Sequence, residues 1–220
     1  MNYYIIAGEA SGDLHGSNLI KELHKLDATA NIRCWGGEKM QAAGATLVKH
    51  YRDLAFMGFV EVITNLRTIF QNLAFCKEDI SAHKPDVLVL IDYPGFNLRI
   101  AEFAKALGIK VIYYISPQLW AWKEGRVEKI KNFVDEMLVI LPFEKEFYRK
   151  HEVDAHFVGH PLLDAISDLP KIDLQKFKSE HNLNDKEIIA LLPGSREQEV
   201  KKMLKLNTKP ILEQQLHTTL

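Results

Sequence analysis

The sequence has little cysteine, no excess of either charge and no metal-ligand spacing. Its two cysteines, Cys34 and Cys76, lie far apart inside apolar stretches. Because small disulfide scaffolds and metal sites need several closely spaced ligands, we expect two buried free thiols, a reducing compartment and no metal. A disulfide between the two is the less favoured alternative. The net charge of −1 over 220 residues leaves no basic footprint, so nucleic acid is not an expected partner.

Long apolar runs are also missing. No stretch reaches the roughly 18 apolar residues of a membrane-spanning helix, and the chain does not open with a basic segment followed by an apolar core. We therefore expect a cytoplasmic protein, which can still lie on a membrane surface. The sequence is nevertheless 47% hydrophobic, enough to bury a substantial core in one domain or in one and a part.

Short apolar runs alternate with amphipathic segments along the chain. The predicted strands are 3–7, 32–35, 87–91, 111–115, 137–140, 156–158 and 188–192. Leu19, Ile20 and Leu23 show the helical spacing of the segment between the first two. This order predicts an α/β fold, a Rossmann-like parallel sheet with helices on both faces. Ligands of such sheets bind at the carboxyl ends of the strands.

The first predicted strand runs directly into a glycine-containing turn and a helix. This turn reads Gly8-Glu9-Ala10-Ser11-Gly12-Asp13. A helix N-terminus favours anions, but two carboxylates would repel a diphosphate and could accept hydrogen bonds from hydroxyls. We predict that Glu9, Ser11 and Asp13 bind a sugar or polyol. Closure of the turn and helix capping are the structural alternative.

A polar stretch from 167 to 185 separates two parts of the chain. After this stretch, the predicted strand 188–192 is followed by a glycine turn, Pro193-Gly194-Ser195-Arg196. The order of strand, glycine turn and helix is the same as at the N-terminus. We predict an N-terminal Rossmann-like, acceptor-side domain at 1–166. Residues 167–220 are expected to form a connection and the incomplete, truncated start of a second, nucleotide-sugar-binding domain.

Six motifs occur in the order typical of one enzyme family. They are Gly8 to Asp13, Met57 to Val62, Ile91 to Asn97, Ser116 to Trp122, Phe157 to Pro161 and Leu192 to Arg196. On these motifs the chain resembles the lipid-A-disaccharide synthases, over the N-terminal domain and the start of the C-terminal domain. The resemblance implies two Rossmann-like domains in the glycosyltransferase B arrangement. The implied reaction belongs to lipid A biosynthesis, and so to the making of the bacterial outer membrane: UDP-2,3-diacylglucosamine and 2,3-diacylglucosamine 1-phosphate form a disaccharide and UDP.

The resemblance also implies partners and a location. No cofactor is implied, and the two diacylated sugars are the expected partners. The expected location is the cytoplasmic face of the inner membrane, with peripheral association, and a homodimer is a further expectation.

The resemblance gives individual residues their roles. Asp92 is implied to be the general base that removes a proton from the acceptor hydroxyl; an N-cap is the structural alternative. Asn97, in the same motif, and Trp122 are predicted to contact substrate, although a bulky core residue is the favoured alternative for the tryptophan. Arg196 is predicted to hold the donor diphosphate bidentately. The alternative for Arg196 is a surface ion pair with Glu199, which would contribute little.

An apolar helical stripe begins within the second motif and continues beyond it. Packing on the core is the ordinary reading of such a stripe, but diacylated substrates must reach the site from a bilayer. The family resemblance implies a membrane-contacting or acyl-chain-contacting surface formed by Val60, Val62, Ile63, Leu66, Ile69 and Phe70. We expect a helix that is partly core and partly interfacial.

Two other functions stay open on the sequence alone. Because the predicted second domain is incomplete, the chain could be an inactive acceptor-binding or dimer-forming fragment of such an enzyme. A UDP-sugar epimerase of similar two-domain shape is the weaker alternative, since it would have no use for the apolar stripe.

Overall fold

The computed structural model describes residues 1–54, 66–121, 124–167, 169–183, 191–194, 200–201 and 203. The chain divides into two compact units, Met1–Asp168 and Leu169–Leu220.

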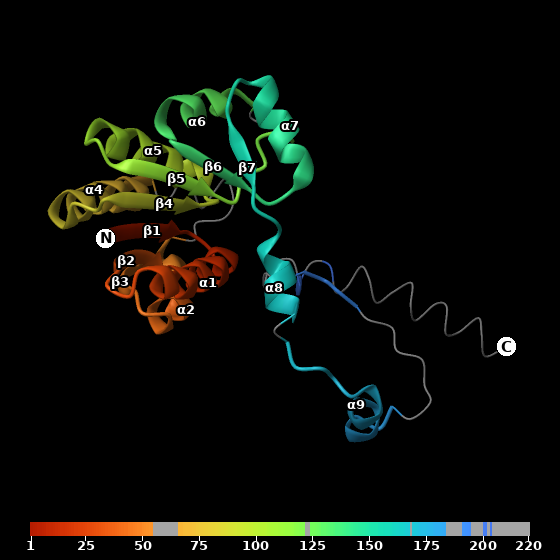
Figure 1. The fold of residues 1–220 in the computed structure, drawn as a ribbon. Coiled ribbons are helices and arrows are strands. Elements are labelled where there is room, and N and C mark those ends of the chain that lie inside the picture. Colours follow the sequence, from red (N-terminus) through yellow and green to blue (C-terminus); the bar gives the residue numbers. More distant parts are fainter. Residues whose placement is uncertain are drawn as a thin grey trace. The chain divides into compact units, whose positions relative to one another are not determined.

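Among the described residues, the first unit contains one parallel sheet of seven strands in the order β3-β2-β1-β4-β5-β6-β7 (Figure 1). The strands are β1 (Asn2–Ala7), β2 (Asn31–Gly36), β3 (Thr46–His50), β4 (Val87–Ile91), β5 (Lys110–Tyr114), β6 (Glu136–Val139) and β7 (Ala155–Phe157). Every neighbouring pair runs parallel. All carboxyl ends therefore meet at one edge of the sheet.

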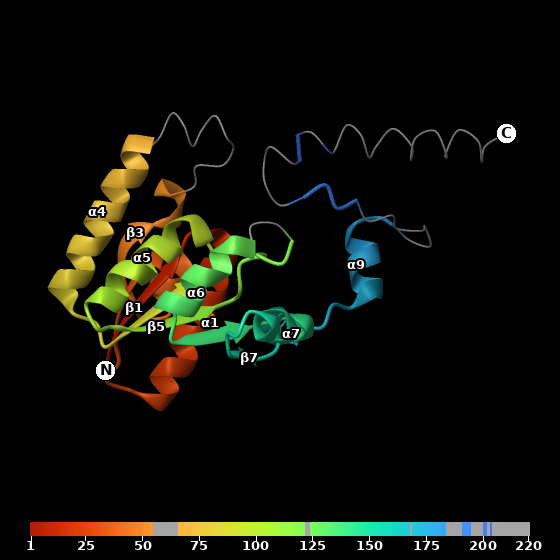
Figure 2. The ribbon, with the colours of Figure 1, turned by 90° about the horizontal axis from the view of Figure 1, so that it is seen from above.

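Helices cover both faces of this sheet. One face carries α1 (Ala10–Leu26) and α2 (Glu38–Ala42), and the other carries α4 (Leu66–His83), α5 (Pro94–Ala106), α6 (Val127–Phe133) and α7 (Pro142–Lys150) (Figure 1). Seen from above in Figure 2, α4, α5 and α6 lie over the strands. Two short 3-10 turns, η1 (Tyr51–Asp53) and η2 (Glu124–Arg126), and α8 (Pro161–Ser167) complete the unit. The predicted Rossmann-like architecture is confirmed.

The central strand β4 is buried along its whole length. Leu88 and Leu90 pack in the core cluster beneath α4 and α5, whereas Val87, Val89 and Ile91 pack in the cluster beneath α1 and α2. Alternate side chains of a strand point to opposite faces, so a strand covered on both faces needs apolar residues at every position. The continuous apolar run therefore has a direct structural cause.

Six of the predicted strands match the observed ones to within one residue at each end. The seventh, 188–192, lies mostly outside the described residues. The strand β3 is not among the predicted strands; it is an edge strand whose residues are half-buried or exposed. Such a strand lacks the apolar run on which the other predictions depended.

The two cysteines are free and buried, as predicted. Burial raises the pKa of Cys34 to about 12 and also raises the pKa of Cys76. Because the thiolate is the reactive form, both thiols are inert at neutral pH.

Within the second unit, the described helix is α9 (Leu174–Glu180). The carboxylate of Asp173 caps it, accepting hydrogen bonds from the backbone N–H groups of Gln175 at 2.9 Å and Lys176 at 3.2 Å. This is an ordinary Asp N-cap.

Candidate active site

Three neighbouring strands bring their carboxyl ends together at the centre of the sheet edge. In the strand register, Ile91 of β4 pairs with Ala7 of β1 on one side and with Tyr114 of β5 on the other. The residues that follow these three positions are Gly8, Asp92 and Ile115. The first and third motifs of the sequence analysis therefore lie side by side.

Asp92 and its neighbour have an unusual backbone conformation. The φ angles of Asp92 and Tyr93 are 44° and 49°, in the left-handed region. Ile115, at the end of the adjacent strand, also has a positive φ of 66°. Such conformations cost non-glycine residues about 1–3 kcal/mol each and cluster at functional sites. Among the described residues, three of the six non-glycine residues with a positive φ therefore lie at the carboxyl ends of β4 and β5.

The environment of Asp92 changes its acidity. Its surface stays open to solvent, but the surrounding protein desolvates the carboxyl group, and the charge of Glu9 adds to this effect. Together they raise the pKa of Asp92 to about 6, against a smaller opposite effect of the Tyr93 backbone N–H. A carboxylate with this pKa can accept a proton near neutral pH, as a general base must.

Both peptide groups that flank the Cα of Asp92 are held by hydrogen bonds. Its N–H donates to the carbonyl of Tyr114 at 3.4 Å. Its carbonyl accepts from the hydroxyl of Tyr113 at 2.5 Å and from Nδ2 of Asn97 at 2.7 Å. The same Nδ2 also donates to the carbonyl of Ile91 at 3.2 Å.

Asn97 itself is fully buried. It was predicted to contact substrate, and the structure gives its amide a different task, since Nδ2 binds the backbone that carries Asp92. Oδ1 of Asn97 is buried and has no hydrogen-bond partner among the described residues.

The opening loop packs against Tyr93. A Cβ atom added at Gly8 would lie 2.4 Å from the Tyr93 ring, so only glycine fits there. The Tyr93 hydroxyl donates to the carbonyl of Leu54 at 3.1 Å, which fixes the ring across the loop. Glu9 precedes α1 and its charge raises the pKa of both Asp92 and Tyr93. The predicted sugar-binding loop and the predicted base are therefore electrostatically coupled.

Asp13 lies in the same loop motif but points into the fold. It is 2% exposed, and its Oδ1 accepts hydrogen bonds from the backbone N–H groups of Gly37 at 2.8 Å and Met40 at 3.0 Å. Its Oδ2 accepts from the N–H of Lys39 at 3.2 Å. Asp13 thus caps α2, a helix other than its own. Ser11, by contrast, is exposed at the start of α1.

The turn after β5 is anchored from within. The buried Ser116 hydroxyl lies 2.8 Å from the hydroxyl of Tyr148 on α7. Further along, Trp120 is 39% exposed and contacts Phe143 edge-on, with ring centroids 5.0 Å apart. Trp122 lies outside the described residues.

Two groups at this edge were not singled out as ligands by the sequence analysis. Tyr113 stands inside a strand and reads as a core residue. His15 on α1 is buried, its Nδ1 has no hydrogen-bond partner among the described residues, and burial together with His160 lowers its pKa. His160 is half-buried and its Nδ1 accepts from the N–H of Leu162 at 3.2 Å.

The predicted donor and membrane residues are only partly described. Arg196, Val60, Val62 and Ile63 lie outside the described residues, as does the side chain of Leu66. Before Arg196, the turn is described as far as Gly194, whose φ of 117° is left-handed. On α4, Ile69 is partly buried against the core and Phe70 is 64% exposed.

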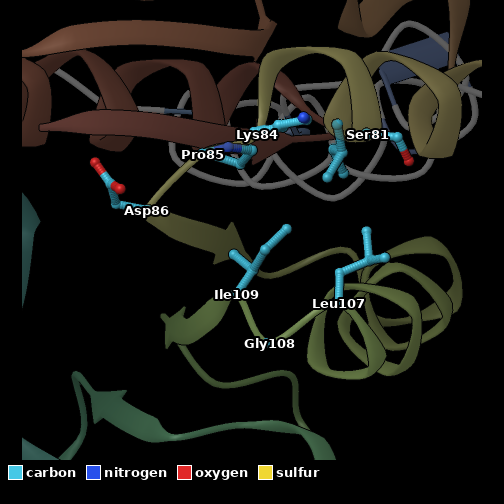
Figure 3. Close-up of a pocket in the computed structure, with 8 residues that line it drawn as sticks. Ser81, Lys84, Pro85, Asp86, Leu107, Gly108 and Ile109 are labelled. Atoms are coloured by element: carbon cyan, nitrogen blue, oxygen red, sulfur yellow. The ribbon is translucent and has the colours of Figure 1, made fainter.

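A hollow of about 480 Å³ lies at the opposite edge of the sheet. Figure 3 shows Asp86 and Ile109, which precede β4 and β5, among its lining residues. None of the predicted site residues lines it. In the part of the chain that the structure describes, no cluster of three or more His, Cys, Asp or Glu side chains is placed to hold a metal ion.

The fold and the site together define a class. A parallel sheet with helices on both faces, whose candidate site lies at the carboxyl ends of its central strands, is a Rossmann-like α/β domain. Among solved structures, the UDP-GlcNAc 2-epimerase from Neisseria meningitidis bound to UDP-GlcNAc is similar with a TM-score of 0.56 and 14% sequence identity. The similarity covers 82% of this chain and 52% of that one. At this identity, it shows the fold alone.

Sequence similarity is more specific. The lipid-A-disaccharide synthetase family matches residues 3–219, and the chain belongs to this family. The lipid-A-disaccharide synthase of Geobacter metallireducens is 46% identical over 200 residues, which is 90% of this chain and 52% of that protein. The enzyme of the same name from Coxiella burnetii is 44% identical over 201 residues, 91% of this chain and 53% of that protein. The chain thus spans about half the length of the curated relatives it matches.

Proposed function

We propose that this chain takes part in inverting glycosyl transfer, joining UDP-2,3-diacylglucosamine to 2,3-diacylglucosamine 1-phosphate in lipid A biosynthesis. Membership of the family supports the reaction. The observation that carries the proposal is the position of Asp92, at the carboxyl end of the central strand with a pKa raised to about 6.

In this proposal Asp92 is the general base. The acceptor hydroxyl attacks the anomeric carbon of the donor sugar from the face opposite the diphosphate. A carbon–oxygen bond forms, the bond to UDP breaks, and UDP leaves with the electron pair. The hydroxyl proton passes to the Asp92 carboxylate. Positioned proton transfer of this kind contributes about 10²–10⁴-fold to a rate.

The opening loop supplies acceptor contacts in the proposal. Glu9 and the exposed Ser11 flank the start of α1 at the same edge as Asp92. Their carboxylate and hydroxyl can bind sugar hydroxyls. Asp13 is not part of this set, because its side chain is 2% exposed and accepts three backbone hydrogen bonds at the start of α2.

Arg196 is proposed to hold the donor diphosphate. The left-handed Gly194 supports a tight turn two residues before it, and a guanidinium can bind two phosphate oxygens at once. Arg196→Lys keeps the charge but loses the bidentate geometry, so we expect weaker UDP binding in calorimetry. Arg149→Lys, which alters an exposed arginine paired with Glu146, is the matched control. Equal UDP affinity of Arg196→Lys and wild type would contradict the bidentate role.

Peripheral association with the inner membrane is proposed for the α4 surface. Within the described residues, no helix is both long and apolar enough to cross a bilayer. A hollow of about 560 Å³ between α4 and α5 is lined by Phe70, Leu73 and Phe103, with Lys77, Arg99 and a single carboxylate, Glu102, beside them. Apolar residues next to cationic side chains suit the boundary between acyl chains and anionic headgroups. This arrangement supports contact with the bilayer that supplies both substrates.

A second candidate function is favoured by one observation. Glu9 and the exposed Ser11 can bind sugar hydroxyls whether or not transfer follows, so acceptor binding without transfer is the alternative.

One experiment separates the two candidates. The purified chain is incubated with the donor alone, the acceptor alone and both together, and UDP release is measured. Transfer predicts UDP release only when both are present. Saturable binding of 2,3-diacylglucosamine 1-phosphate without UDP release would contradict transfer by this chain and favour the acceptor-binding function.

A further inference from the structure

The backbone strain at Asp92 must be balanced by interactions that hold it. Two consecutive non-glycine residues with φ near +45° stand at the end of β4. Left-handed conformations of this kind persist only when the surrounding structure fixes them. The groups that contact the two peptide units around Asp92 are therefore the groups that set the direction of its side chain.

A single carbonyl oxygen receives two of these contacts. The hydroxyl of Tyr113 and Nδ2 of Asn97 donate to the Asp92 carbonyl at 2.5 and 2.7 Å. One donor comes from the neighbouring strand β5 and the other from α5, the helix that follows Asp92. Because a peptide unit is planar, fixing this carbonyl fixes ψ of Asp92 and φ of Tyr93 together.

The peptide group on the other side of the Asp92 Cα is held by β5, the strand that also carries Tyr113. The Asp92 N–H donates to the carbonyl of Tyr114 at 3.4 Å. This contact restricts φ of Asp92. With the dihedral angles on both sides restricted, the direction of the Cα–Cβ bond is determined, and the carboxylate is limited to the rotamers about that bond.

The two donors are themselves immobile. Tyr113 and Asn97 are both 0% exposed. The Tyr113 ring packs within the core cluster beneath α5 and α6, where side chains occupy single rotamers in a close-packed interior. Both donor groups are therefore shielded from solvent, although the residue that accepts their hydrogen bonds is exposed.

We propose that Tyr113 and Asn97 are positioning residues, which hold the Asp92 carboxylate in the place from which it meets the acceptor hydroxyl. This inference rests on the proposed function for its catalytic meaning. Neither side chain touches substrate in it. The hydroxyl and the amide act through the peptide unit after Asp92.

Tyr113→Phe tests the inference with little change of shape, since it removes the donor and keeps the ring. The matched control is Tyr4→Phe, which removes the hydroxyl of another fully buried tyrosine. That hydroxyl donates to Oδ2 of Asp79 at 2.6 Å and has no contact with Asp92. Asn97→Ala is the second variant and keeps the test decisive if Tyr113→Phe does not fold.

The first measurement does not depend on activity. Carboxyl-carbon NMR of the 220-residue chain follows the titration of Asp92. In wild type we expect a midpoint of about 6. In Tyr113→Phe and Asn97→Ala we expect this midpoint to fall toward the ordinary value of about 3.9, because the released carboxylate moves away from Glu9 and from the protein groups that desolvate it. Tyr4→Phe should keep the wild-type midpoint. Unchanged midpoints in both test variants would overturn the inference.

The second measurement tests whether the positioning of Asp92 affects catalysis. A misplacement of about 1 Å can cost about 10²-fold in rate, so Tyr113→Phe should lower kcat for UDP release by about 10–100-fold with little change in KM. If the Asp92 titration shifts in the test variants but the wild-type chain releases no UDP, the positioning role stands. The proposed function is then refuted. The opposite outcome is that UDP release depends on Asp92, but Tyr113→Phe keeps both the wild-type kcat and the wild-type titration midpoint. This outcome would refute the positioning role and leave the proposed function standing.

Discussion

Removing the Asp13 carboxylate tests whether this residue is a structural cap. The side chain is buried and accepts three backbone N–H groups, from Gly37, Lys39 and Met40. An N-cap acceptor contributes about 1 kcal/mol, and a hydrogen bond to a charged group contributes about 1.5–3 kcal/mol. Because the three bonds share one carboxylate and are not additive, we expect Asp13→Ala to lower the free energy of unfolding by about 3 kcal/mol.

The two oxygens of Asp13 provide a graded comparison. Asp13→Asn can keep Oδ1, which accepts two of the three hydrogen bonds, so its loss should be about half that of Asp13→Ala. Urea unfolding followed by tryptophan fluorescence, to which the buried Trp35 just before the capped turn contributes, measures both losses. Glu22→Ala, on the exposed face of the same helix α1, should stay within about 0.5 kcal/mol of wild type. An Asp13→Ala variant as stable as this control would refute the capping account.

Two further predictions concern acidity and the membrane surface. Asp92 acts when deprotonated, so the rate of UDP release should fall below about pH 6. Glu9→Gln removes a charge that raises the pKa of Asp92, so the acidic side of its pH–rate profile should move to lower pH. An unchanged pH–rate profile would contradict the electrostatic coupling between Glu9 and Asp92. On α4, Phe70 is 64% exposed and Leu73 only 7%. Phe70→Ser should weaken partitioning onto anionic vesicles without a change in circular dichroism, while Leu73→Ser should destabilise the fold by about 2–5 kcal/mol. Equal vesicle binding of Phe70→Ser and wild type would contradict a membrane contact of Phe70.

The parts of the fold that follow from local pattern could be predicted from the sequence. The continuous apolar run of β4 reports burial on both faces, and the rule that ligands bind at carboxyl ends of strands leads directly to Asp92. The half-buried edge strand β3 carries no such run and was missed.

The parts that depend on distant partners could not be predicted. The acceptor of the Gly37 hydrogen bond lies 24 residues away at Asp13. The opening loop alone indicates sugar binding by Asp13 and does not indicate that this residue caps α2. Tyr113 sits in an apolar run, and nothing in that run indicates that its hydroxyl reaches the end of the neighbouring strand. The raised pKa of Asp92 likewise needs the fold, which desolvates its carboxyl group and brings the charge of Glu9 near it.

The central claim is that Asp92 takes the proton of the acceptor hydroxyl. The most direct measurement compares UDP release from both diacylated substrates by the wild-type chain and by Asp92→Asn, which keeps the size of the side chain. Asp86→Asn, at the other end of β4, is the control. We predict that Asp92→Asn lowers the rate by at least about 10²-fold with an unchanged circular dichroism spectrum, and that the control stays near the wild-type rate. Equal rates of UDP release by Asp92→Asn and wild type would contradict the account.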